Sequence, residues 1–154
     1  MRKSRAMLAA LLWLATSTAF AQSYRVDDSA SQVLGSTLRL KPAATPARGT
    51  PVYQVSGEIE VLVRLDVAPW LGRRGRIYMR LPERSGRSVI ASWTTRGRLL
   101  PGTVRSGERA LVYNGPISVR TIEDTQRLRI EADGRYLRPS EQLEFTFEID
   151  LDPS

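Results

Sequence analysis

Arginine is the residue type in this sequence best suited to binding chemistry, and it is concentrated in the middle of the chain. The stretch 64–109 holds eleven arginines against three acidic residues, a net charge of +8. Guanidinium groups bind carboxylates and phosphates through paired hydrogen bonds, so this stretch predicts an anion-binding face. The candidate binding residues lie just after Pro69 and along the strand expected there: Trp70, Arg73, Arg74, Arg76, Tyr78 and Arg80.

A compositional explanation of these arginines stands beside the functional one. Residues 22–154 contain 19 arginines and one lysine, Lys41, as expected if solvent-facing positions fill with arginine in a GC-rich coding sequence. The same residues carry 20 basic and 16 acidic side chains, so their net charge of +4 is ordinary for a small domain. This charge gives no reason to expect nucleic acid as a partner.

The absence of cysteine and histidine removes many chemistries from consideration. Disulfides, zinc sites with cysteine or histidine ligands and triads with a histidine base are all excluded. Glu123 and Asp124 are adjacent, and adjacent residues on a strand point to opposite faces, so they are not expected to form a catalytic pair. We therefore expect no enzymatic activity, no cofactor and no metal site.

The first 21 residues have the pattern of a secretory signal peptide. Arg2, Lys3 and Arg5 precede an apolar stretch over 6–15, and the segment ends in the small-x-small pattern at 19–21. The apolar stretch is shorter than the ~20 residues that a membrane-spanning helix needs. We expect cleavage after Ala21 and no transmembrane segment in the mature chain, which then begins at Gln22.

The elements that must position the arginines are β-strands, because the hydrophobic pattern alternates with a period of two. In the clearest run, 143–151, Phe147 and Ile149 share one face while Glu144, Glu148 and Asp150 share the other. Further strands are expected at 34–40, 59–67, 76–81, 89–95, 110–113 and 127–133. With frequent turns between them, these runs predict a single antiparallel β-sandwich of about seven or eight strands over 22–154, immunoglobulin-like in architecture.

Turn residues and aromatic residues give more local predictions. Asp133-Gly134 favours a tight hairpin with positive φ, and residues 41–51, with three prolines, predict an extended loop or linker. Trp93 alternates with its neighbours on a probable core face, whereas Trp70 follows Pro69 in a loop and is expected to be exposed.

The acidic stripe on the last strand has two interpretations that depend on strand order. If this strand lies beside the one carrying Arg76 and Arg80, Glu148 and Asp150 form cross-strand pairs within one domain, which is the default expectation. If the two strands lie at opposite edges, the same charges join molecules head to tail and build a fibre.

Export, an all-β fold and the lack of catalytic motifs favour a structural or assembly protein of the bacterial cell envelope. Such a protein, in the periplasm or at the cell surface, acts through envelope proteins or self-association, as a fibre or pilus-like subunit or an assembly accessory. Strand addition is one route, and 23–40 contains a candidate strand. The alternative function is a binding module that uses the arginine-rich face for an anionic envelope polymer, glycan or lipid head group.

Overall fold

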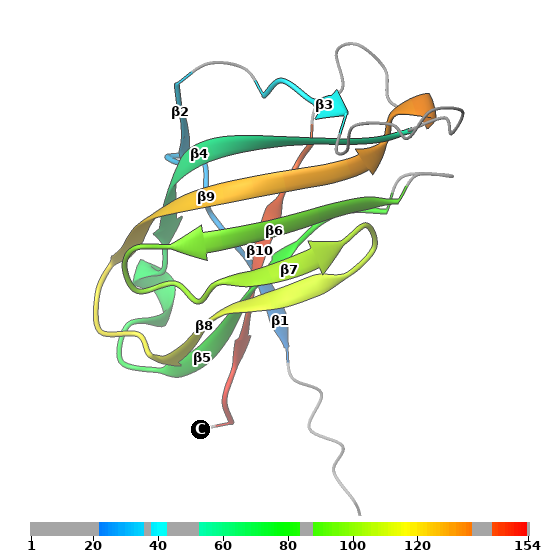
Figure 1. Cartoon of the computed structure of the whole chain (residues 1–154). Coiled ribbons are helices and arrows are strands. Elements are labelled where there is room, and N and C mark those ends of the chain that lie inside the picture. The colour runs from blue at the N-terminus through cyan, green and yellow to red at the C-terminus, as the bar shows by residue number, and fades with distance from the viewer. Residues whose placement is uncertain (1–21, 36–37, 43–52, 84–87, 137–142, 154) are drawn as a thin grey trace, which may run out of the picture.

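The computed structural model describes residues 22–35, 38–42, 53–83, 88–136 and 143–153. The predicted signal peptide, 1–21, lies outside these residues, as does most of the loop expected at 41–51. In the described part, ten strands form two antiparallel sheets, and two short 3-10 helices accompany them (Figure 1). This all-β arrangement is consistent with the predicted sandwich.

The two sheets differ in size and in where the chain termini enter them. The four-stranded sheet has the order β1 (Ser23–Val26), β10 (Thr146–Leu151), β5 (Arg74–Arg80), β8 (Arg109–Pro116). The six-stranded sheet has the order β2 (Gln32–Leu34), β4 (Gln54–Asp66), β9 (Thr121–Asp133), β6 (Val89–Thr95), β7 (Gly102–Arg105), and β3 (Lys41–Pro42) also pairs with β4. Helix η1 (Ala68–Trp70) follows β4, and η2 (Gly134–Tyr136) follows β9. In Figure 1, β10 passes behind β4 and β9 at a steep angle, and β1 lies beside its lower part.

The core lies between the sheets and is built from the alternating apolar positions that the sequence predicts. Both sheets contribute, with the side chains of Leu65, Ile77, Ile130 and Ile149 at most 2% exposed. Trp93 is buried as expected, and its ring N–H donates a hydrogen bond to the Leu100 carbonyl oxygen at 2.9 Å. The long strands β4 and β9 pair along all 13 residues and form the frame of the six-stranded sheet.

The strand predicted at 34–40 is wrong. Strand β2 ends at Leu34, because the next residue, Gly35, has a φ of 102° that breaks the extended backbone. Beyond it, the backbone of Arg39 crosses Gly57 so closely that a Cβ built on Gly57 would lie 2.6 Å from the Arg39 carbonyl oxygen. Residues 38–40 therefore pack across β4 without joining the sheet as a strand.

The hairpin predicted at Asp133-Gly134 is also wrong. Gly134 does not have positive φ, and it opens the helix η2 instead of a tight turn. Its N–H donates a hydrogen bond to the Tyr53 carbonyl oxygen at 2.6 Å, and a Cβ there would lie 3.1 Å from a methyl group of Val55. Glycine is favoured at this position by the close approach of Val55 and of the Tyr53 carbonyl oxygen, rather than by a left-handed backbone.

Candidate functional site

The predicted binding residues do not form one uniform surface. Arg74, Arg76, Tyr78 and Arg80 alternate along β5 with buried positions and so share the outer face of the four-stranded sheet. Arg73 is exposed just before the strand. Trp70, expected to be exposed, is half-buried in η1, where it packs against the core with its ring centroid 6.2 Å from that of Tyr24.

The acidic stripe lies directly beside the β5 arginines, because β10 is the neighbour of β5. Arg80 Nη1 lies 3.2 Å from Glu148 Oε1, and Arg76 Nη2 lies 3.6 Å from Asp152 Oδ1. Arg74 Nε is 3.9 Å from the other carboxylate oxygen of Asp152. The default expectation of cross-strand pairs within one domain is thus confirmed. These arginine side chains are 43–63% exposed, so each pair contributes only ~0–1 kcal/mol.

The strongest pair on this face involves Arg109, which the sequence reasoning missed. Arg109 donates two hydrogen bonds to Asp150, at 3.2 and 3.0 Å, and its guanidinium carbon lies 4.2 Å from the centre of the Tyr78 ring. Hydrogen bonding to the Asp150 carboxylate raises the pKa of Arg109. Because Arg109 is on β8 and Asp150 is on β10, only the strand order, with β5 between them, reveals this pair.

A polar depression of about 240 Å³ lies at the β1 side of this face. Arg25, Arg80 and Glu148 line it, together with Ser23, Tyr24 and Thr146. Since the Arg80 guanidinium is already bonded to Glu148 within it, an anionic ligand would have to displace an internal carboxylate.

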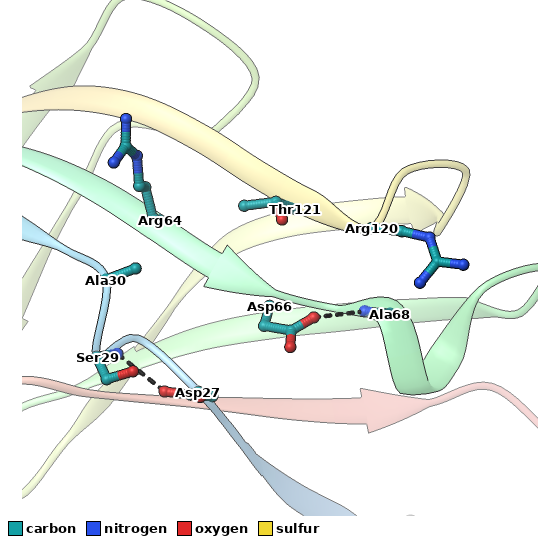
Figure 2. A pocket seen from close by; sticks show the side chains of 8 residues that line it. All are labelled: Asp27, Ser29, Ala30, Arg64, Asp66, Ala68, Arg120 and Thr121. Carbon is teal, nitrogen blue, oxygen red and sulfur yellow. Dashed lines mark hydrogen bonds between the residues drawn. The ribbon is translucent and has the colours of Figure 1, made fainter.

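A larger cleft, of about 390 Å³, lies where β1, β4 and β9 meet (Figure 2). Its carboxylates belong to Asp27 and Asp66, and its guanidinium groups to Arg64 and Arg120, as Figure 2 shows; Ser29, Ala30, Ala68 and Thr121 complete the lining. The backbones of Asp27 and Asp66 are joined by a hydrogen bond of 2.9 Å, which fixes β1 to the end of β4.

Both carboxylates in the cleft hold local backbone turns. Asp27 accepts a hydrogen bond from the Ser29 N–H at 2.9 Å, and Asp66 accepts one from the Ala68 N–H at 3.0 Å. The bond from Ser29 lowers the pKa of Asp27, so this group is ionised at neutral pH. Among the described residues, no group of three or more acidic side chains is placed to hold a metal ion.

Comparisons with known proteins give no family for this chain. No family model, no curated protein and no solved structure matches it. Within the described residues, no helix is long and apolar enough to cross a membrane.

Proposed function

We propose that this chain is an exported, non-enzymatic β-sandwich of the bacterial cell envelope, immunoglobulin-like in character, that acts in structure, assembly or protein–protein interaction. The observation that supports this best is the edge strand β2. All three of its residues are exposed, with Val33 at 56% and Leu34 at 40%, and none of them is charged. Proteins normally protect sheet edges by keeping the edge strand short or with charges, prolines or a covering segment. Strand β2 is short, but its two exposed apolar side chains favour a protein partner.

The four-stranded sheet also has an open edge among the described residues. Strand β1 is the outer strand of its sheet, paired only with β10 among the described residues, and its Tyr24 is 38% exposed. Ser31, just before β2, is anchored to β4, because its hydroxyl oxygen accepts a hydrogen bond from the Arg64 N–H at 2.9 Å. An incoming strand would therefore meet a sheet edge held in place, and backbone hydrogen bonds would supply affinity.

Binding of an anionic polymer or glycan through the β5 arginines is the second candidate. Ion pairs within the molecule make this candidate weaker, because three of the candidate arginines already contact Glu148 in β10 or Asp152 just after it. Replacing Arg73, Arg74 and Arg76 together with serine tests it, because unchanged binding to envelope polymers would remove this candidate.

The main proposal is tested by expressing the full chain in a bacterium and measuring the mass and association state of the product. We expect the envelope fraction to contain a chain beginning at Gln22. In light scattering, self-association through apolar edges would persist in 0.5 M salt, whereas association through surface charges would be lost as the Debye length shortens. An unprocessed, cytoplasmic product would contradict the proposal. A monomer in both buffers would assign the partner role to a different envelope protein.

A further inference from the structure

Two loops at one end of the sandwich repeat the same arrangement of side chains. Leu71, in the β4–β5 connection, is 41% exposed and lies two positions from Arg73. Leu100, in the β6–β7 connection, is 42% exposed and lies two positions from Arg98. Neither arginine has a carboxylate within 4 Å in the part of the chain that the structure describes, unlike the arginines of β5.

Hydrogen bonds join both loops to β8 or to the residue that follows it. The Gly72 N–H donates to the Ile117 carbonyl oxygen at 2.9 Å, and the Leu100 N–H donates to the Val112 carbonyl oxygen at 2.7 Å. Figure 1 shows the β4–β5, β6–β7 and β8–β9 connections together on the left of the view. We call residues Leu71, Arg73, Arg98, Leu100 and Arg120 the loop-end surface.

The β6–β7 loop is held in a fixed shape by side chains beneath it. Asp124, only 5% exposed, accepts hydrogen bonds from the N–H groups of Arg96 at 3.2 Å and Leu99 at 2.8 Å. The Thr95 hydroxyl donates to the Leu99 carbonyl oxygen at 2.7 Å. Because Leu99 fills the core position and is 2% exposed, the following Leu100 is kept outside the core by the same geometry.

Three carboxylates near the loop-end surface bond to other groups of the protein. Asp124 is buried under the β6–β7 loop, and Asp66 accepts a hydrogen bond from the Ala68 N–H. Glu123 is paired with Arg64 at 2.6 Å. Arg120, exposed in the β8–β9 connection, adds a third guanidinium with no carboxylate within 4 Å among the described residues, although Asp27 and Asp66 line the same cleft.

We propose that the loop-end surface docks onto the anionic phospholipid surface of a membrane. The leucines would enter the boundary between head groups and acyl chains, while the arginine guanidinium groups bind lipid phosphates. A soluble polyanion would satisfy the arginines but would have no use for two exposed leucines beside them. This proposal does not depend on the function proposed for the β2 edge.

The test is sedimentation of the protein, expressed from the full chain, with vesicles of equal parts phosphatidylglycerol and phosphatidylcholine. We expect binding that falls in 0.5 M salt and is absent with phosphatidylcholine alone. Each basic residue near an anionic surface strengthens binding roughly fivefold, so Arg73→Ser with Arg98→Ser should weaken it on the order of thirtyfold. Leu71→Ser with Leu100→Ser should weaken it by about tenfold or more.

Matched controls distinguish membrane binding by this surface from binding caused by net charge alone or by exposed apolar side chains elsewhere. Arg39→Ser with Arg105→Ser removes the same charge from two other arginines that have no described carboxylate partner, and should leave binding within about twofold. Val33→Ser with Leu34→Ser removes apolar surface from the β2 edge and should also leave it unchanged. Absent binding to the anionic vesicles, equal weakening by the control arginines, or full binding after the leucine change would each overturn the proposal.

Discussion

Arg109 and Asp150 form a paired hydrogen-bond contact across an intervening strand. Arg109 reaches from β8 over the Tyr78 ring of β5 to the Asp150 carboxylate on β10, with its Nη2 atom 3.0 Å from Oδ2. The contact ties three strands together and consumes the most buried carboxylate of the acidic stripe, which is 7% exposed at the side chain. On the outer face of the four-stranded sheet, Arg109 therefore binds a carboxylate of the protein itself and is not free to bind an external anion.

Asp150→Ala should lower the free energy of unfolding by about 1–2 kcal/mol, because it removes both hydrogen bonds from the Arg109 guanidinium, which is 41% exposed and keeps only a longer contact to Glu148 at 3.8 Å. Urea denaturation followed by circular dichroism measures this. Asp152→Ala is the matched control, since that side chain is 39% exposed and its pairs are 3.6 and 3.9 Å long. The control should change stability by less than ~0.5 kcal/mol. If both variants lost the same free energy of unfolding, the Arg109–Asp150 pair would contribute no more to stability than an exposed ion pair.

The strand order explains why this face was only partly predicted. Alternation identified the outward positions of Arg76, Arg80, Glu148 and Asp150 correctly, because the period of two depends only on local sequence. Which strands are neighbours depends on non-local pairing, so the sequence left open whether these charges meet within one molecule. Arg109 was missed for the same reason.

Close backbone approaches were the other feature hidden from the sequence. The Gly57 site, where the Arg39 backbone crosses β4, has no local signal, since glycine within a strand run indicates only that something unusual occurs. Likewise, the turn propensity of Asp133-Gly134 was outweighed by the hydrogen bond from Gly134 to Tyr53. Trp70 was misjudged because its sequence neighbours do not reveal Tyr24, which packs beside it.

Gly57→Ala should be strongly destabilising, by about 2 kcal/mol or more, because the new methyl group would lie 2.6 Å from the Arg39 carbonyl oxygen. Gly115→Ala is the matched control. A Cβ at Gly115 would have its nearest neighbour at 3.5 Å, an ordinary contact with the Tyr113 hydroxyl. Thermal unfolding of the two variants should therefore separate clearly. A Gly57→Ala protein as stable as the control would contradict the crossing of β4 by residues 38–40.

Gln126→Met should raise the free energy of unfolding by about 1–2 kcal/mol. The Gln126 side chain is fully buried in β9, and neither its Nε2 nor its Oε1 atom has a hydrogen-bond partner among the described residues. Methionine has a similar length and removes the cost of an unsatisfied buried amide. Denaturant unfolding measures the change, and a destabilised variant would mean that the amide is satisfied in solution, as by an internal water molecule.

Asp133 provides a prediction of pH dependence. The hydrogen bonds from Arg135 hold the pKa of Asp133 below its ordinary value. Because the pKa is lower in the folded state than in the unfolded state, the pair stabilises the protein at neutral pH, and this contribution is lost as the pH falls through the folded-state pKa. The difference in melting temperature between the wild type and Asp133→Asn should therefore shrink toward acidic pH. A difference that stays constant down to pH 2 would contradict this.

The most direct test of the interaction proposed at the β2 edge is photo-crosslinking in living cells. A benzophenone side chain is placed at position 33 of the full chain, with position 105, on the opposite edge strand β7, as the control. We expect a discrete protein adduct in the envelope fraction from position 33 and none from position 105. No adduct from position 33, or the same adducts from both positions, would contradict a role in protein–protein contact through this edge.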